Sequence, residues 1–361
     1  MAIGSVGEQT GVLGAIFSAG PKAVQAWVNG VNAKGGLGCH PLKYIIADDG
    51  GDPSRNQALV QRLVEQDGVI AFVHMNAPFA GQASVKYLND KRVPVIGSET
   101  GSPWFYTSPM HFPQASSDFM LYRLVVATAG YLGQQNGGLT KLALIACVEA
   151  PACSGANGVV DKYAQEFGLQ VVYKASGTLT APDYTANCQQ AKSAGAQIWW
   201  IALDGNSVRR LAKSCANVGY HPVFVVAQPN STLDMTQDAA LDGLGVGLPV
   251  IPWNLANHPA VAEYQAVLKQ YAPGLKFDGQ TTLGWVSAKL FEKAASSQPS
   301  TITSQSVLDG LWGLKGEDLG GMTYPLRFLK DEPAPQVMCY WMTQIQKGQF
   351  VPLNNAQREC K

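Results

Sequence analysis

"YIIADDGGDPSRNQALVQRLVEQDGVIAFV", residues 44–73, contains a complete structural unit. The apolar run Tyr44–Ala47 is typical of a short strand. Apolar residues then recur at helical spacing between residues 54 and 66, and VIAFV at 69–73 is an uninterrupted apolar run. Such runs are typical of strands that a parallel sheet buries on both faces. The stretch therefore predicts a strand, a helix and a second, parallel strand.

The aspartates at 48, 49 and 52 raise the question of a metal or catalytic site. Asp52 directly precedes Pro53, the pattern of a helix N-cap followed by proline at the first helical position. The glycines at 50 and 51 permit a tight turn. A calcium loop needs ligands at alternating positions and a distal glutamate, and neither is present. We predict capping and turn formation for the three aspartates.

The alternation of strand and helix recurs along the chain. Further expected strands are 2–6, 93–96, 142–147, 170–173, 197–203 and 223–227, with a hairpin of 337–342 and 350–353 around QKGQ. Expected helices are 24–31, 81–90, 155–167, 183–194, 207–218, 259–271, 280–296 and 303–314. A new series starts after Gly137-Gly138, which predicts two doubly wound α/β domains.

Composition excludes several classes of partner. A chain of 361 residues exceeds one ordinary core and suits two domains. Its 26 basic and 26 acidic residues give no electrostatic footprint for nucleic acid or an acidic membrane surface. No run approaches the roughly 18 apolar residues that a membrane span needs. The N-terminus does not resemble a signal peptide, so the chain is either cytoplasmic or one whose signal was replaced by Met1.

Seven cysteines are present, and none forms a CxxC pair, which argues against a zinc knuckle or a thioredoxin-like motif. Disulfides and buried free thiols are both compatible with the spacing. Because the number is odd, at least one thiol stays unpaired or bonds between molecules. The positions are 39, 147, 153, 188, 215, 339 and 360.

Catalytic signatures are absent: there is no GxGxxG, GxxxxGK[ST], GxSxG or HExxH. The five histidines show no metal-ligand spacing, so we expect no metal and no cofactor. His74 is the histidine of interest, because it follows the end of a predicted strand. An α/β enzyme with dispersed catalytic residues, tested by substituting His74 and Glu149, stays an alternative.

The loops that follow the strands of the first domain contain the residues that indicate ligand binding. They read GEQTGVLGAIFSAG, HMNAPFAGQAS and GSETGSPWFY, and ligands of open α/β sheets bind at such positions. Their hydroxyl and backbone N–H groups suit a carboxylate. Phe17, Phe79 and Trp104 add aromatic faces. We predict a site for a small, partly apolar carboxylate, and the alternative is ordinary loop chemistry with aromatic side chains packed in the core.

Residues 11–73, with VNAKGGLGCHPL and DDGGDPSRN, resemble the first lobe of periplasmic solute-binding proteins of the leucine/isoleucine/valine-binding type. The resemblance continues through VPVIG, through FPQASSD and through GAQIWWIALDGNSVRRLAKSCANVGYHPVFV, and covers nearly the whole chain. It implies the type I periplasmic binding protein fold, in which two doubly wound Rossmann-like lobes are joined by a three-strand hinge.

The expected crossovers are Pro113–Ser117, Gly247–Trp253 and Tyr324–Lys330. The expected first lobe is 1–115 plus 251–326, and the expected second lobe is 116–250 plus 327–361, with the ligand cleft between them.

By the same resemblance, the protein has no catalytic activity and delivers a small molecule to the membrane permease of an ABC importer. Hinge closure on the ligand is the implied mechanism. We therefore expect an extracytoplasmic, periplasmic monomer that contacts neither nucleic acid nor the bilayer directly. A ligand-sensing domain of a receptor or regulator with the same fold is the alternative.

The resemblance places first-lobe ligand groups at Asn76, Ala77 and Thr100. In the second lobe it points to the loops that contain Glu149, Asp204 and Gln228.

Amino-acid-binding members hold the ammonium with a second-lobe carboxylate, but the matching loop here reads AQPNST. An unpaired buried ammonium is costly, which favours an aromatic or apolar carboxylate. An amino acid is the alternative ligand, with Asp204 or Glu99 as the ammonium partner.

Overall fold

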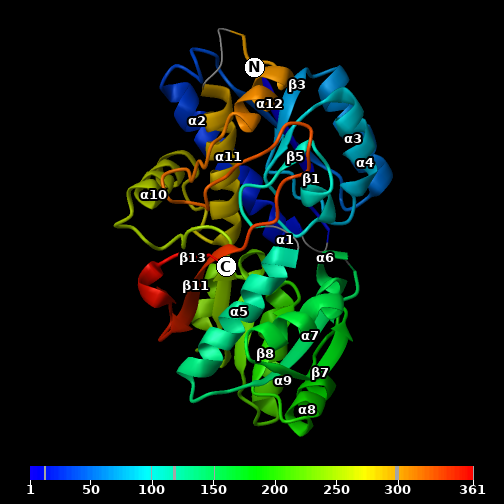
Figure 1. The fold of residues 1–361 in the computed structure, drawn as a ribbon, viewed down its shortest axis with the longest axis vertical. Coiled ribbons are helices and arrows are strands. Elements are labelled where there is room, and N and C mark those ends of the chain that lie inside the picture. Colours follow the sequence, from blue (N-terminus) through cyan, green and yellow to red (C-terminus); the bar gives the residue numbers. More distant parts are fainter. Residues whose placement is uncertain (12–13, 99, 117–118, 150, 297–300, 361) are drawn as a thin grey trace. The chain divides into compact units, whose positions relative to one another are not determined.

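A computed structural model describes residues 1–11, 14–98, 100–116, 119–149, 151–296 and 301–360. The chain forms two compact units, Met1–Asp118 with Trp253–Val337 and Phe119–Pro252 with Met338–Lys361 (Figure 1). Each unit has its own β-sheet covered by helices, which confirms the predicted α/β class. Among the helices in these ranges, none has both the length and the apolar character needed to cross a bilayer.

The first unit has a parallel five-stranded sheet in the order β2-β1-β3-β4-β5. Its strands are β1 (Ala2–Gly7), β2 (Lys43–Asp48), β3 (Val69–Val73), β4 (Val95–Ile96) and β5 (His111–Phe112). Its helices are α1 (Gly14–Phe17), α2 (Ala19–Ala33), α3 (Pro53–Glu65), α4 (Gln82–Lys91), α10 (Pro259–Tyr271), α11 (Gly279–Ser296) and α12 (Ser304–Trp312).

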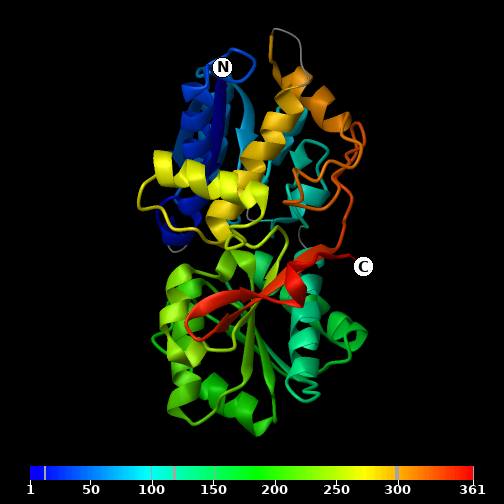
Figure 2. The same ribbon diagram turned by 90° about the vertical axis from the view of Figure 1, so that its left-hand side faces the viewer.

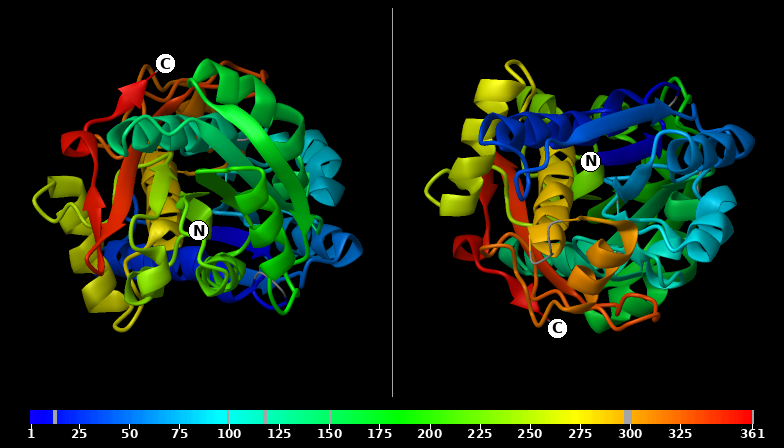
Figure 3. Two further views of the ribbon diagram at one scale, coloured as in Figure 1. Left: turned by 90° about the horizontal axis from the view of Figure 1, so that it is seen from below. Right: turned by 90° about the horizontal axis from the view of Figure 1, so that it is seen from above.

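Helices cover both faces of this sheet. Helices α2 and α11 pack together on one face, and α3 and α4 pack together on the other (Figure 3). Val60 and Leu63 of α3 and Leu88 of α4 form a core with Phe72 and Val95 of the sheet. The continuous apolar run of β3 is buried because helices cover the sheet on both sides, as the sequence predicts for a parallel strand.

The aspartate cluster is structural, as predicted. The Asp52 carboxylate caps α3 by accepting a hydrogen bond of 2.8 Å from the backbone N–H of Arg55. Asp49 accepts bonds of 2.8 Å from the Gly51 N–H and 2.7 Å from the Asn56 side-chain amide. No group of acidic, histidine or cysteine side chains among the residues described is arranged to hold a metal ion.

The second unit has a mixed sheet in the order β12-β11-β10-β9-β8-β6-β7, and β13 pairs with β11. Its strands are β6 (Lys141–Cys147), β7 (Gln170–Gly177), β8 (Ile198–Ala202), β9 (Val223–Ala227), β10 (Gly245–Leu248), β11 (Cys339–Gln346), β12 (Gln349–Pro352) and β13 (Glu359–Cys360). Its helices are α5 (Phe119–Gln135), α6 (Pro151–Ser154), α7 (Ala156–Glu166), α8 (Thr185–Ser193) and α9 (Gly205–Asn217). The predicted hairpin is β11 and β12, drawn red in Figure 2.

Helix α5 is the main element that sequence analysis missed. Buried residues occupy nearly every position from Leu121 to Ala129, so the helix has almost no polar face. It packs against α7 and the middle strands of the sheet. Without an alternation of polar and apolar residues, periodicity gives no helical signal.

The last boundary between the units also differs from the expected lobes. Residues 327–337 belong to the first unit, not to the second. The Phe328 ring packs edge-on against Phe112 at a centroid distance of 5.1 Å. The Asp331 carboxylate lies 2.9 Å from the Arg92 guanidinium. These contacts, one with strand β5 and one with the end of helix α4, hold the segment against the first unit.

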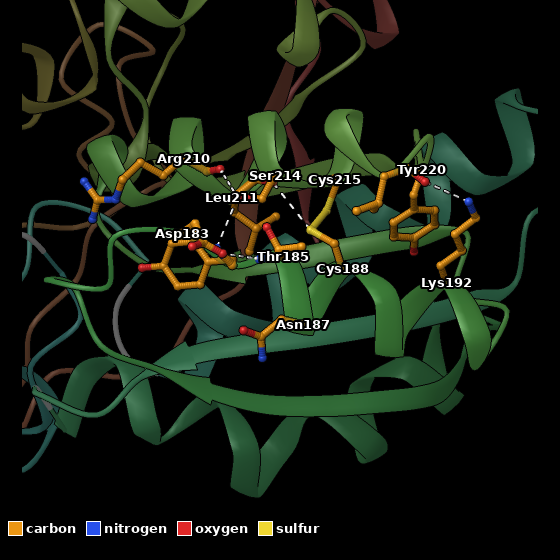
Figure 4. The surroundings of a disulfide bond; sticks show 12 residues. Asp183, Thr185, Asn187, Cys188, Lys192, Arg210, Leu211, Ser214, Cys215 and Tyr220 are labelled. Atoms are coloured by element: carbon orange, nitrogen blue, oxygen red, sulfur yellow. Dashed lines mark hydrogen bonds between the residues drawn. A yellow bond between two sulfur atoms is a disulfide. The ribbon is translucent and has the colours of Figure 1, made fainter.

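The structure contains disulfides, one of the two states that the cysteine spacing allowed. The pairs are Cys147–Cys153, Cys188–Cys215 and Cys339–Cys360. Cys39 is exposed and free, in agreement with the odd number of cysteines. The Cys188–Cys215 bond joins α8 to α9 (Figure 4).

Candidate functional site

In the first unit, the loops after β1, β3 and β4 meet at the carboxyl edge of the sheet, because these strands are neighbours and parallel. The Glu8 N–H donates to the Asn76 carbonyl at 3.0 Å, and the Met75 N–H donates to the Gly97 carbonyl at 3.0 Å. Gly7 permits this approach, since a Cβ at its position would lie 2.1 Å from the Asn76 carbonyl oxygen. The binding loops predicted from the sequence therefore lie together.

Two of the predicted ligand residues, Asn76 and Thr100, carry unsatisfied polar atoms. Both residues are fully buried, and Asn76 Oδ1 and Thr100 Oγ1 have no hydrogen-bond partner in the described part of the chain. The Thr100 backbone has φ of 70°, an unusual value for a β-branched residue, and its N–H donates to Ser98 Oγ at 2.9 Å. An unpaired buried polar atom costs about 1–3 kcal/mol. Bonds from a ligand would remove that cost.

The other predicted residues of this edge differ in their surroundings. Trp104 and Ala77 belong to the hydrophobic core around Met75 and Phe105. Phe17 is buried in α1, whereas Phe79 is half-buried. A Cβ built on Gly51 would lie 3.2 Å from the Phe79 ring, so the ring lies against the turn after β2.

Glu99 lies outside the described residues.

Glu8 is a buried acid at this edge that sequence analysis did not select. Only 2% of its surface is exposed, and it follows β1 directly. A Cβ on Gly11 would lie 2.9 Å from its Oε1 atom, and one on Gly51 would lie 3.6 Å from Oε2. The available signal was its position, since the first residue after an inner parallel strand lies at the ligand-binding edge.

Asp48 fixes the loop that carries Glu8. Its carboxylate accepts hydrogen bonds from the backbone N–H groups of Gln9 at 2.9 Å and Gly50 at 3.0 Å, and from Thr10 Oγ1 at 2.6 Å. Burial alone would raise the pKa of Asp48, but the bonds from Thr10, Gln9 and Gly50 together lower it. The carboxylate therefore stays charged and positions the backbone.

In the second unit, Glu149, Asp204 and Gln228 follow β6, β8 and β9, which are adjacent in the sheet. Asp204 caps α9 and accepts bonds from the N–H groups of Ser207 at 3.1 Å and Asn206 at 3.3 Å. Gln228 is fully buried. The three loops to which the resemblance points therefore follow neighbouring parallel strands and lie at one edge of this sheet.

Both carboxylate oxygens of Glu149 accept hydrogen bonds from the nearby backbone. Its Oε1 accepts from the Leu179 N–H at 2.8 Å, and its Oε2 accepts from the Val148 N–H at 3.1 Å. Glu149 and Asp204 therefore both stabilise local backbone. Sequence reasoning could not separate this role from ligand binding, because caps and ligand sites use the same side chains.

His74 packs inside the first unit. Its Nδ1 lies 3.0 Å from Ser287 Oγ, and Ser287 Oγ donates to the Leu283 carbonyl at 2.8 Å, so Nδ1 carries the proton. Nε2 faces Gly20 of α2, where a Cβ would lie 2.0 Å away. Burial lowers the pKa of His74 to about 3. A neutral, enclosed imidazole gives no support to a catalytic role.

Two doubly wound units with polar loops at the carboxyl edges of their sheets define a type I periplasmic binding protein fold. The periplasmic binding protein family model matches residues 1–349, and the chain belongs to this family.

Three solved structures illustrate the similarity. A branched-chain amino acid ABC transporter protein from Thermus thermophilus with bound valine has a TM-score of 0.85 at 18% identity, covering 98% of this chain and 95% of that one. A fatty acid ABC transporter substrate-binding protein from Thermomonospora curvata has a TM-score of 0.81 at 15% identity, covering 98% and 91%. A solute-binding protein of an ABC transporter from R. palustris in complex with benzoate has a TM-score of 0.78 at 13% identity, covering 98% and 95%.

At these identities the similarity shows the fold alone. A search of curated protein sequences finds no match to the chain.

Proposed function

We propose that this protein is the extracytoplasmic substrate-binding component of an ABC importer and that it binds a small aromatic or apolar carboxylate. The observation that carries the ligand class is the buried, neutral hydroxyl of Thr100, which has no hydrogen-bond partner among the described residues and can donate to a carboxylate. Family membership supports the transport role. The similar folds that bind valine, fatty acid and benzoate indicate how many ligand classes this scaffold accepts.

The charge of the ligand follows from the groups around it. The Thr100 hydroxyl can donate to a carboxylate. The Asn76 side-chain N–H donates to Gln280 Oε1 at 3.4 Å, so Asn76 Oδ1 is left to accept from an N–H or O–H donor. A buried ammonium needs a carboxylate partner. Asp204 and Glu149 already bind backbone N–H groups, and the loop at 228–230 offers an amide. These second-unit groups therefore suit a carboxylate without an amine, and Glu8 of the first unit is the buried acid that an amine would have to use.

The proposed mechanism is ligand capture by closure of the two units. A ligand that contacts both units stabilises the closed state by the contacts that exist only there. The permease would then receive the closed, loaded protein. The protein itself catalyses no reaction and acts as a monomer.

The test is a thermal-shift screen with benzoate, hexanoate, benzamide, hexanamide and valine at about 1 mM. A ligand with a dissociation constant near 1 µM adds about 4 kcal/mol to the free energy of unfolding by mass action. We expect a carboxylate to raise the melting temperature by several degrees and its amide to do so far less. A larger shift with valine would contradict this ligand class and would point to Glu8 as the ammonium partner.

Thr100→Val is expected to weaken carboxylate binding by about 10–100-fold, because a hydrogen bond to a charged group contributes roughly 1.5–3 kcal/mol. Stability without ligand should stay equal or rise slightly, since the variant removes a buried hydroxyl that has no partner among the described residues. Titration calorimetry and melting curves measure the two quantities. Thr107→Val, at an exposed position of the same segment, is the control. Equal affinity in the two variants would show that Thr100 does not contact the ligand.

A further inference from the structure

Arg210 of the second unit is a half-buried cation without an acidic partner in the described part of the chain. Its Nη2 atom donates to the Leu179 carbonyl at 2.6 Å and to Ser207 Oγ at 2.7 Å, and both acceptors are neutral. Its Nε atom is buried and makes no hydrogen bond to any described residue. In Figure 4 the guanidinium extends away from the Cys188–Cys215 disulfide.

The guanidinium lies at the carboxyl edge of the second sheet. Side chains on a helix lean toward its N-terminus, and Arg210 is in the second turn of α9. One acceptor, Leu179, follows the end of β7, and the other, Ser207, is in the turn of α9 that follows β8. Ligands of open α/β sheets bind outside this edge.

Arg210 differs from its neighbour Arg209 in its charged surroundings. Arg209, the preceding residue, forms an ion pair with Asp234 and lies 4.0 Å from Asp238. Glu149 and Arg210 both bind the backbone of Leu179, Glu149 by accepting from its N–H and Arg210 by donating to its carbonyl. Both Glu149 oxygens already accept from backbone groups. Arg210 is therefore held in place by neutral acceptors.

We propose that Arg210 binds the carboxylate of the transported ligand and determines its selectivity for anions. This inference rests on the proposed function and adds the group that supplies positive charge. Guanidinium has five N–H donors, and the two bonds from Nη2 orient it without neutralising it. Hydrogen bonds between guanidinium and carboxylate are stronger than bonds between neutral groups. Anion recognition requires a cation that is fixed at the ligand edge, and Arg210 is such a cation with no acidic partner among the described residues.

The experiment compares Arg210→Gln, Arg210→Lys and Arg209→Gln with the unchanged protein. Binding of benzoate, hexanoate, benzamide and hexanamide is measured by titration calorimetry. We expect the Arg210→Gln protein to bind the carboxylate about 10–100-fold more weakly than the unchanged protein does. The loss of affinity in Arg210→Lys should be smaller. Arg209→Gln should keep the original affinity, and the ratio of carboxylate to amide affinity should fall only in the Arg210 variants. Melting curves establish that each variant is folded.

The outcomes separate the two proposals. A carboxylate that binds the unchanged protein and Arg210→Gln equally would overturn the role of Arg210 and leave the proposed function standing. Equal losses in the Arg209 and Arg210 variants would overturn it as well, because they would indicate a general charge effect. No binding of any carboxylate by the unchanged protein would contradict the proposed ligand class itself. If Arg210→Gln does not fold, Arg210→Lys decides by its carboxylate-to-amide ratio.

Discussion

Gly284→Ala is expected to lower the free energy of unfolding of the first unit by about 3 kcal/mol. A Cβ at position 284 would lie 2.2 Å from the carbonyl oxygen of Gly20, 2.8 Å from its carbonyl carbon and 2.9 Å from its Cα. Helices α11 and α2 thus touch through their backbones, and a backbone cannot rotate away as a side chain can. The better helix propensity of alanine, roughly 1 kcal/mol, offsets only part of the loss.

Gly20 also explains why this loss would reach the binding edge. Gly20 contacts Gly284 of α11 and also lies against His74 Nε2. His74 is the first residue of the loop that carries Asn76. Separation of α11 from α2 would therefore disturb that histidine. The expected result is a lower midpoint in urea unfolding together with weaker ligand binding.

Gly158→Ala is the matched control for this prediction. Gly158 lies on the exposed side of α7, and a Cβ there meets no atom within 4 Å. This variant should be about 0.5–1 kcal/mol more stable than the unchanged protein. Equal urea midpoints for the two variants would contradict the close backbone contact between α2 and α11.

Local patterns predicted most of the fold because its elements carry strong signals. Strand β3 and helix α10 have the predicted bounds, since the first is a continuous apolar run and the second begins with proline at its first position. Helix α5 was missed because burial on nearly all sides removed its periodicity. The final boundary between the units depends on contacts such as Phe328 with Phe112, which no local pattern encodes.

The candidate site was predictable to the extent that sheet topology defines it. Asn76 and Thr100 follow strand ends, and each carries a buried atom that has no hydrogen-bond partner in the part of the chain that the structure describes. Glu8 also follows a strand end but was not selected. Arg210 is six residues into its helix, and only the hydrogen bonds to Leu179 and Ser207 reveal where its side chain lies. Side-chain direction is therefore the information that the sequence pattern lacked.

Acidification from pH 7 to pH 4 is expected to destabilise the first unit by about 3 kcal/mol for each of two buried histidines, His74 and His111. Burial lowers the pKa of each imidazole to about 3, against an ordinary value of 6.5. Below pH 6.5 the unfolded chain binds a proton at each site while the native protein stays neutral. The stabilisation is therefore complete above pH 6.5 and is lost as the pH falls toward 3.

The surroundings of both rings keep them neutral in the same way. His111 Nδ1 lies 2.8 Å from Ser108 Oγ, and that hydroxyl donates to Asn89 Oδ1 at 2.6 Å. Each Nδ1 therefore donates to a serine oxygen whose own proton is directed elsewhere. A second proton on His74 would be added at Nε2, which faces Gly20 and has no acceptor among the described residues. Protonation thus requires the unit to open.

His74→Asn tests this explanation. Asparagine tolerates the positive φ of 59° at this position, and its amide can replace the Nδ1–H donor to Ser287. Urea unfolding at pH 7, 6, 5 and 4 should show that the variant loses about 3 kcal/mol less than the unchanged protein over this range. His221→Asn, at an exposed position, is the control for removing a histidine. An unchanged pH dependence in His74→Asn would mean that the imidazole is protonated in the folded protein, and its packing against Gly20 would then have to be looser than the structure shows.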